Sequence, residues 1–376
     1  MTKADKKVVV RAFSKQYIRG RKSEKSQLLT KLEATTSYSR KHLMEILVNP
    51  PKLKVRHRRR QDSKYLVVIK PLRKIWVISN YACGQRFKPM IPHYLAALRR
   101  HKELIVLPWE RKLLLNISSA TIDRLLKADR VKINIKGRSR TKPGTLLKHQ
   151  IPIKMWTDWD ETIPGFLEID SVHHCGGNLL GDYIYTLDTQ DVSTGWNECC
   201  AHLGKGEIRT VKALETIRKR LPFTLLGIDF DCGGEFVNYH LIRYSKRNQI
   251  TYTRAREGMK NDQNYIEQQN YSVVRRFVGY QRLDTEKQLM LLNQLYVKLS
   301  SYQNFFQPVM RLKEKIRDGA KVTRKYGIPQ TAYQRLLKRS DILADTKRKL
   351  RERYKTLNPK KLLLEITDLG NKLQKR

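Results

Sequence analysis

The stretch that most constrains this chain runs from Leu225 to Val278. Its first part, LLGIDFDCGGEF, is an apolar run that ends in carboxylates and glycines, as expected of a buried strand that meets a loop. Its last part, KNDQNYIEQQNYSVVRRFV, predicts a helix that begins near Gln263 and carries Glu267 in its first turns. Between Asp231 and Glu267 lie 35 residues.

A second acidic strand end lies upstream, in FLEIDSVHHCGG, where an apolar run ends at Asp170. Three acids at two strand ends and one helix start can converge on a divalent metal ion. Mg²⁺ prefers carboxylate oxygens, which suits Asp170, Asp231 and Glu267 and explains why no His and Cys cage is needed. Adjacent residues of a strand point to opposite faces, so His173, His174 and Cys175 make a poor metal cage.

These acids and their surroundings resemble the DDE catalytic core of the retroviral-integrase-like transposases, and most of all the bacterial insertion-sequence members. The resemblance rests on Asp170, on Asp231 followed by Cys-Gly-Gly-Glu-Phe, on Asn264-Tyr-Ile-Glu267 and on the 35-residue spacing. It covers Pro164 to Pro308 well and the front of the chain more loosely. It implies an α/β core with a ribonuclease-H-like mixed sheet flanked by helices, preceded by all-α helix-turn-helix modules.

The resemblance also implies the chemistry. Two Mg²⁺ ions, for which Mn²⁺ can substitute, would support an in-line displacement, with Asp170 bridging both ions and Asp231 and Glu267 each holding one. Water would cut at the element end, and the exposed 3′-OH would attack target DNA without a covalent protein intermediate. Glu168, Asp229 and Asn264 are expected to lie next to these metal ligands without binding the ions themselves. Glu168 and Asp229 share the faces of Asp170 and Asp231, so a four-acid ribonuclease site is an open alternative.

The net charge of +42 in 376 residues points to a polyanion as partner. The charge is unevenly spread: residues 165–280 hold 14 Lys and Arg against 14 Asp and Glu, whereas residues 1–64 hold 19 against 5. A neutral core between basic flanks fits an enzyme whose flanks hold double-stranded DNA, on which we expect a homo-oligomer. A ribosomal-type or solvated basic surface is the alternative.

Five cysteines without CxxC spacing favour reduced thiols in a bacterial cytoplasmic protein that reaches the nucleoid through DNA. The N-terminal sequence lacks the apolar core of a signal peptide, and no segment is expected to span a membrane.

The first module, residues 1–52, is predicted to be a helix-turn-helix. Apolar spacing indicates helices over residues 23–34 and 39–48, with Ser39 as the N-cap of the second and Pro50-Pro51 after it. Arg40 and Lys41 at the start of the second helix are expected to contact DNA. An ordinary helical hairpin is the alternative.

Residues 53–131 form the second predicted module. It begins with a basic linker whose Arg58, Arg59 and Arg60 are expected to contact phosphates. Residues 109–130 repeat the helix-turn-helix pattern, with Ile117-Ser118-Ser119 as the turn, and Thr121 and Arg124 would face a groove. Residues 132–160 read as a basic linker along DNA. Its candidate contacts are Arg138, Arg140 and Lys142.

The catalytic core is assigned to residues 161–310. Strands are predicted at 166–170, 182–188, 194–202, 225–231 and 250–253, and helices at 207–220 and 238–247. Arg275 and Arg276, after Glu267, are expected to contact DNA phosphates or face solvent. Thr285 is predicted to cap a long helix with Gln288 as its reciprocal partner. The apolar stripe of this helix is predicted to lie in the core rather than at an interface; its members are Leu292, Leu295, Leu299, Tyr302 and Phe306. Residues 311–376 form a basic extension that would bind DNA or a second subunit.

Three other functions compete with a transposase. A tyrosine recombinase needs an HxxR box, and His240 with Arg243 fits that pattern only on the helix after the carboxylate strand. A ribonuclease-H-like nuclease would share the fold but would not need two upstream modules. A DNA-binding regulator with an inactive core would not need the three acids.

Overall fold

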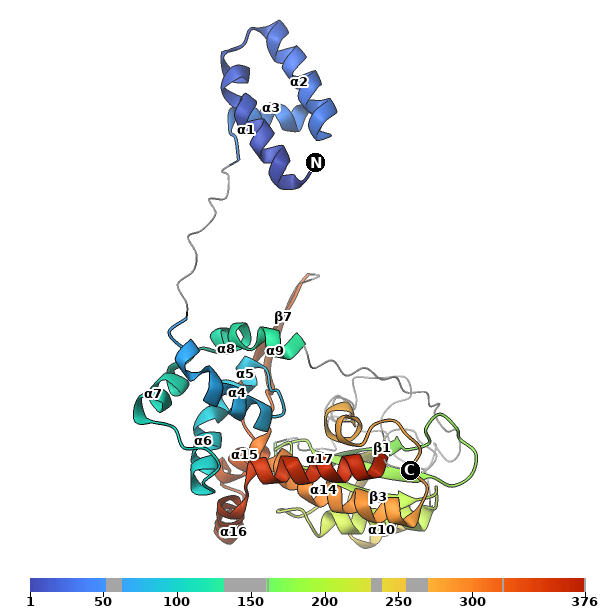
Figure 1. Ribbon diagram of the computed structural model, residues 1–376. Coiled ribbons are helices and arrows are strands. Elements are labelled where there is room, and N and C mark those ends of the chain that lie inside the picture. The colour runs from blue at the N-terminus through green and yellow to red at the C-terminus, as the bar shows by residue number, and fades with distance from the viewer. Residues whose placement is uncertain are drawn as a thin grey trace. The chain divides into compact units, whose positions relative to one another are not determined.

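The computed structural model describes residues 1–51, 63–131, 160, 162–230, 239–254, 270–319 and 321–374. The chain forms two compact units, Met1–Ser63 and Lys64–Arg376 (Figure 1). No helix in these described ranges is both long and apolar enough to cross a membrane.

The first unit is a three-helix bundle of α1 (Lys3–Arg19), α2 (Lys22–Thr36) and α3 (Arg40–Val48). Its core includes Val10 of α1, Leu32 of α2 and Leu43 of α3, all buried. The predicted cap of α3 is present, since Ser39 Oγ accepts a hydrogen bond from the backbone N–H of His42. Apolar spacing predicted α2 and α3, whereas α1 was not predicted.

The second unit begins with short helices. They are η1 (Leu66–Val68), α4 (Ile69–Ile78), α5 (Gly84–Phe87), η2 (Lys88–Met90), α6 (Ile91–Arg100), α7 (Pro108–Asn116), α8 (Ser119–Leu125) and α9 (Lys127–Val131). The turn between α7 and α8 falls where the sequence predicted it, and Ser118 caps α8 by accepting from the Thr121 N–H at 3.1 Å. Asp123 of α8 accepts from the Gly84 N–H at 2.9 Å, which ties α8 to α5.

The sheet of the second unit has five strands in the order β3-β2-β1-β4-β5. They are β1 (Phe166–His173), β2 (Ile184–Asp191), β3 (Asn197–Leu203), β4 (Gly227–Phe230) and β5 (Thr251–Arg254). The pairs β1–β2 and β2–β3 are antiparallel, whereas β1–β4 and β4–β5 are parallel. This mixed sheet, flanked by helices, fits the expected ribonuclease-H-like fold.

Helices cover both faces of the sheet. On one face, α10 (Glu207–Arg218) and α11 (Tyr239–Arg247) pack with Leu167, Ile169 and Ile228 in one apolar cluster. On the other face, α14 (Glu286–Phe306) packs with Val172 and Ala201. The predicted Thr285 cap and its Gln288 partner are confirmed. So is the apolar stripe of α14, whose buried members are Leu292, Leu295, Leu299, Tyr302 and Phe306.

Side chains protect the outer edge of β3. Asn304 binds both the N–H and the C=O of Asn197, each at 2.8 Å, and Asn293 binds the N–H and C=O of Ala201 at 2.9 and 3.0 Å. The Arg220 guanidinium donates to the Cys199 carbonyl between them. These contacts satisfy backbone groups that an edge strand would otherwise offer to another chain.

Residues 311–374 fold onto the rest of the second unit. They form β6 (Leu312–Asp318), β7 (Lys321–Tyr326), α15 (Ala332–Lys338), α16 (Ala344–Thr356) and α17 (Pro359–Gln374). Figure 1 shows α17 running alongside α14, and Leu362 and Ile366 of α17 share the apolar cluster of α14.

The helices before the sheet join this same cluster. Tyr94 Oη of α6 donates to the Phe306 carbonyl at 2.9 Å, and Tyr302 Oη donates to the Ile78 carbonyl at 2.6 Å. The helices between residues 64 and 131, the sheet and the C-terminal helices are therefore parts of one compact unit.

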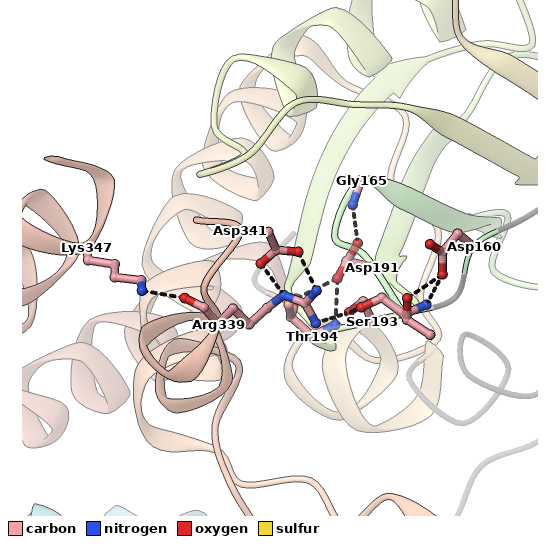
Figure 2. A network of polar contacts seen from close by, with 9 residues as sticks. Asp160, Gly165, Asp191, Ser193, Thr194, Arg339, Asp341 and Lys347 are labelled. Carbon is pink, nitrogen blue, oxygen red and sulfur yellow. Dashed lines mark hydrogen bonds and ion pairs between the residues drawn. The ribbon is translucent and has the colours of Figure 1, made fainter. Parts of the chain in front are cut away.

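The turn between β2 and β3 is held by arginines from the C-terminal region. Arg335 donates to the Thr194 carbonyl at 3.0 Å, Arg339 to Ser193 Oγ at 3.0 Å, and Arg311 to the Val192 carbonyl. In Figure 2, Arg339 also pairs with Asp341, and Lys347 of α16 donates to the Arg339 carbonyl.

Buried Asp191 organises the same turn from inside. Its carboxylate accepts from the Gly165 N–H at 2.8 Å and from the Thr194 N–H at 2.6 Å (Figure 2). Burial raises the pKa of Asp191, and these hydrogen bonds act in the opposite direction. The turn thus links the start of β1 with the C-terminal helices.

Candidate active site

Asp170 lies on β1, the central strand of the sheet, and its side chain is half-buried. One of its carboxylate oxygens accepts from the Ser171 N–H at 2.7 Å. The parallel neighbour of β1 is β4, whose last residue, Phe230, pairs with Ile169. Because β1 and β4 are parallel, their carboxyl ends lie at the same edge of the sheet.

Asp188 of β2 lies directly opposite Asp170 in the antiparallel register, on the same face of the sheet. Its side chain is fully buried, and one oxygen accepts from Asn197 Nδ2 at 2.6 Å. Burial raises the pKa of Asp188 to about 7; hydrogen bonds from Asn197 and Cys199 lower it, and the negative charge of Asp170 raises it. Asp188 was not among the acids singled out from the sequence, because only the register of β2 against β1 brings it opposite Asp170.

Glu168 and Asp229 also pair directly, across the parallel register of β1 and β4. Both are buried, and Asp229 accepts from Thr253 Oγ1 of β5 at 2.6 Å. Alternation along β1 puts Glu168 and Asp170 on one face. Acidic residues from β1, β2 and β4 therefore share that face of the sheet.

The helical segment that follows Glu267 in the sequence is anchored to β1. The π-helical turn η4 (Asn270–Arg275) leads into α13 (Arg276–Val278), and η4 packs against β1 through buried Val273 and Val274. Arg275 donates to the His173 carbonyl at the end of β1 at 2.8 Å. Interruptions of this kind in helices occur often at functional sites.

Of the three proposed metal ligands, only Asp170 falls in the described residues, whereas Asp231 and Glu267 lie outside them, as does Asn264. The described parts of the chain hold no group of three His, Cys, Asp or Glu side chains that could bind a metal ion. The donors that Asp170 and Asp188 offer are carboxylate oxygens, which suit a hard cation such as Mg²⁺.

His174 lies in the protein core beside the end of β1. His174 is buried, and its Nε2 lies 2.9 Å from Thr186 Oγ1. Burial lowers the pKa of His174 to about 3, and the positive charge of Arg275 lowers it further. His174 is therefore a neutral core residue at physiological pH.

The residues predicted to contact DNA differ in exposure and in the hydrogen bonds that they make within the protein. On α3, Lys41 is exposed, whereas the Arg40 guanidinium donates to Ser26 Oγ and Thr30 Oγ1 of α2 at 2.6 and 3.0 Å. On α8, Arg124 is exposed and donates to Thr121 Oγ1 at 3.0 Å.

Two further candidates are bound within the protein. Arg275 holds β1 as described, and Arg276 donates to the Asn80 carbonyl at 2.9 Å. The remaining candidate contacts lie outside the described residues; they are Arg58, Arg59, Arg60, Arg138, Arg140 and Lys142.

The buried Asp188 carboxyl predicts a pH-dependent stability. Its folded pKa of about 7 exceeds the ordinary value of 3.8, so the folded state binds its proton more tightly. The free energy of unfolding should therefore fall as pH rises from about 4 to 7, by roughly 2 to 4 kcal/mol from this group. Asp188→Asn keeps an acceptor for Asn197 and removes the charge, so it should flatten this slope. Urea unfolding in EDTA at several pH values measures the unfolding free energy of the unmodified protein and of Asp188→Asn. If this free energy changed equally with pH in the two proteins, the raised pKa of Asp188 would be contradicted.

The mixed five-stranded sheet flanked by helices fits an α/β protein of ribonuclease-H-like fold. No family model matches the sequence. The chain is 34% identical over 322 residues to "Uncharacterized protein y4rM" of Sinorhizobium fredii (strain NBRC 101917 / NGR234), a match that covers 85% of this chain and 92% of that protein. The chain therefore belongs to the same family as y4rM.

Two solved structures are similar in part. The catalytic core domain of BIV integrase has 16% identity and a TM-score of 0.26, over 31% of this chain and 70% of that one. The HTLV-2 integrase catalytic core domain, solved in complex with magnesium in a dimeric form, has 13% identity and a TM-score of 0.30, over 40% of this chain and 93% of that one.

Proposed function

We propose that this protein is a DNA transposase or integrase, a polynucleotidyl transferase that cleaves the ends of a DNA element and joins the 3′-OH to target DNA. The observation that carries the proposal is the placement of Asp170. It lies on the central strand, beside the parallel strand β4 that ends one residue before Asp231 in the sequence. No covalent protein–DNA intermediate is part of this proposal.

In this proposal, Asp170, Asp231 and Glu267 hold two Mg²⁺ ions. When bound, these ions would activate the attacking oxygen and stabilise the leaving oxygen of an in-line displacement. The half-buried side chain of Asp170 supports this role, whereas Glu168, Asp188 and Asp229 are buried. These buried acids are proposed to orient the ligands, as Asn264 would.

Double-stranded DNA is the proposed partner, both as element ends and as target. The support is the charge of +42, which lies in the flanks of a neutral core. The three-helix unit, with Lys41 exposed on α3, is proposed to read the element ends, and the protein is proposed to act as a homo-oligomer on DNA.

A ribonuclease-H-like nuclease is the second candidate, because buried Glu168, Asp188 and Asp229 add carboxyl groups to the face that carries Asp170. A strand-joining assay distinguishes a transposase from a nuclease, since a nuclease would release cut strands and join none of them to target DNA. A DNA-binding regulator would neither cleave nor join DNA. Inverted repeats and short target duplications around the gene would support the transposase.

Removing residues 1–63 tests the assignment of end recognition. The second unit should stay folded, because Lys64–Arg376 is compact by itself. The shortened protein should bind random DNA but lose its preference for element ends. Contacts to base edges recognise the DNA sequence, whereas contacts to phosphates only fix the position of the protein on the duplex. Competition binding with end and scrambled duplexes measures the preference, and urea unfolding checks the fold. If the shortened protein kept its full preference for element ends, the region that recognises the end sequence would lie outside residues 1–63.

A further inference from the structure

The strands β6 and β7 form a separate two-stranded hairpin, which projects from the body of the second unit (Figure 1). Among the described residues of 312–326, none belongs to a hydrophobic core cluster, and Leu312, Ile316 and Tyr326 are exposed. An isolated hairpin of this kind is only marginally stable in water. Core packing therefore does not account for this hairpin.

The base of the hairpin is firmly attached. Val309 and Gln330 exchange backbone hydrogen bonds of 2.9 and 3.3 Å, and the Gly327 N–H donates to the Arg311 carbonyl at 2.9 Å. The Arg311 guanidinium in turn donates to the Val192 carbonyl in the turn between β2 and β3. The hairpin thus projects from a base that is joined to the sheet of the catalytic core.

The register of the hairpin separates its charges. Residues 312–326 hold six Lys and Arg against two Asp and Glu. Both acids lie on one side, because Glu314 pairs with Lys325 at 2.9 Å and Asp318 lies opposite position 321 in the register. That side is close to neutral.

The other side carries only positive charge. Positions 315, 317, 322 and 324 alternate with the acidic pairs and share one side of the ribbon. Arg317 and Arg324 on this side are exposed, and Arg317 uses one donor on the Gly319 carbonyl at 3.3 Å. Both guanidinium groups are therefore accessible to an anionic partner.

We propose that the basic side of the β6–β7 hairpin binds the backbone of duplex DNA alongside the catalytic core. A strand of seven residues is about 20 Å long, and a two-stranded ribbon fits the major groove, which is about 12 Å wide. Arginine forks match phosphate geometry, and the contact would be independent of base sequence. The inference rests on the proposed function only for the choice of DNA as the polyanion.

The test compares two full-length triple variants. One replaces Lys315, Arg317 and Arg324, the three basic residues at positions of the basic side, with glutamine. The other replaces Lys298, Lys361 and Lys372, which pair with acids on α17. Fluorescence anisotropy with a random-sequence duplex in EDTA gives the affinity and its salt dependence. The hairpin variant should bind about 10- to 50-fold more weakly, with a salt slope smaller by roughly 2 to 3, and the control should change little.

Unchanged affinity and slope in the hairpin variant, or equal losses in both variants, would overturn the inference. Normal DNA binding with a lost oligomer in light scattering would also overturn it and would assign the hairpin to a second copy of the chain. Metal-dependent cleavage by the unmodified protein is a separate readout. Binding through the hairpin without any cleavage would reject the catalytic proposal alone, whereas cleavage with unaffected binding in the hairpin variant would reject the hairpin alone.

Discussion

Asp170→Asn is expected to reduce metal-dependent DNA cleavage and joining by roughly 10³-fold or more while DNA binding survives. The substitution keeps the shape of the side chain and an acceptor for the Ser171 N–H, so the fold should be unaffected. What it removes is the charge that would hold a divalent cation at the centre of the sheet. Single-turnover cleavage at saturating Mg²⁺, with equal DNA occupancy, measures the loss.

Glu168→Gln is the matched control for Asp170→Asn, because Glu168 lies on the same strand and face but is buried. It should lose about tenfold in rate at most, or lose stability, because it would act only through the ligands. Full activity of Asp170→Asn would contradict the metal-ligand role of Asp170. Equal loss in both variants, with Glu168→Gln still folded, would favour the four-acid ribonuclease site.

Truncation after residue 310 is expected to unfold the second unit, although the sequence presents residues 311–376 as a basic extension. This segment supplies buried apolar side chains to the core, among them Tyr333, Leu336, Leu350, Leu362, Ile366 and Leu373. At about 1.5 to 3 kcal/mol each, they contribute roughly 10 kcal/mol or more, comparable with the whole stability of a domain. Solubility and cooperative urea unfolding of the truncated chain measure this. A soluble truncated chain with an unchanged midpoint would contradict it.

Gly370→Ala in the full chain tests the same packing. A Cβ at this position of α17 would lie 2.5 Å from the Phe277 carbonyl oxygen of α13, so the two helices must separate. The expected loss is about 1 to 3 kcal/mol of unfolding free energy. Helix propensity alone would give the opposite sign, about 1 kcal/mol of stabilisation. Leu364→Ala on the exposed side of α17 is the matched control and should have little effect.

Local signals explain why much of the fold could be predicted from sequence. The apolar run around Ile169 and the caps at Ser39 and Thr285 each depend on neighbouring residues. The α14 stripe was found because its apolar residues repeat with the helical period. The strand order was not predicted, since pairing of β1 with β4 joins distant segments. The resemblance implied only that the sheet is mixed.

Long-range contacts explain what sequence reasoning missed. Asp188 faces Asp170 only through the register of two strands. Arg335 and Arg339 look like surface charges in the sequence, but they hold the turn between β2 and β3. The β6–β7 hairpin was missed because its strands are rich in charged residues and lack an apolar alternation.

We propose that Asp231, rather than Asp229, completes the site with Asp170 and Glu267. Asp229 is buried and accepts from Thr253, whereas Asp231 follows the end of β4 and gives the 35-residue spacing to Glu267. Single-turnover cleavage in Mg²⁺, at equal DNA occupancy, compares Asp231→Asn with Asp229→Asn. We expect Asp231→Asn and Glu267→Gln to lose roughly 10³-fold or more and Asp229→Asn about tenfold or less. An inactive Asp229→Asn beside an active Asp231→Asn would contradict the proposed catalytic register.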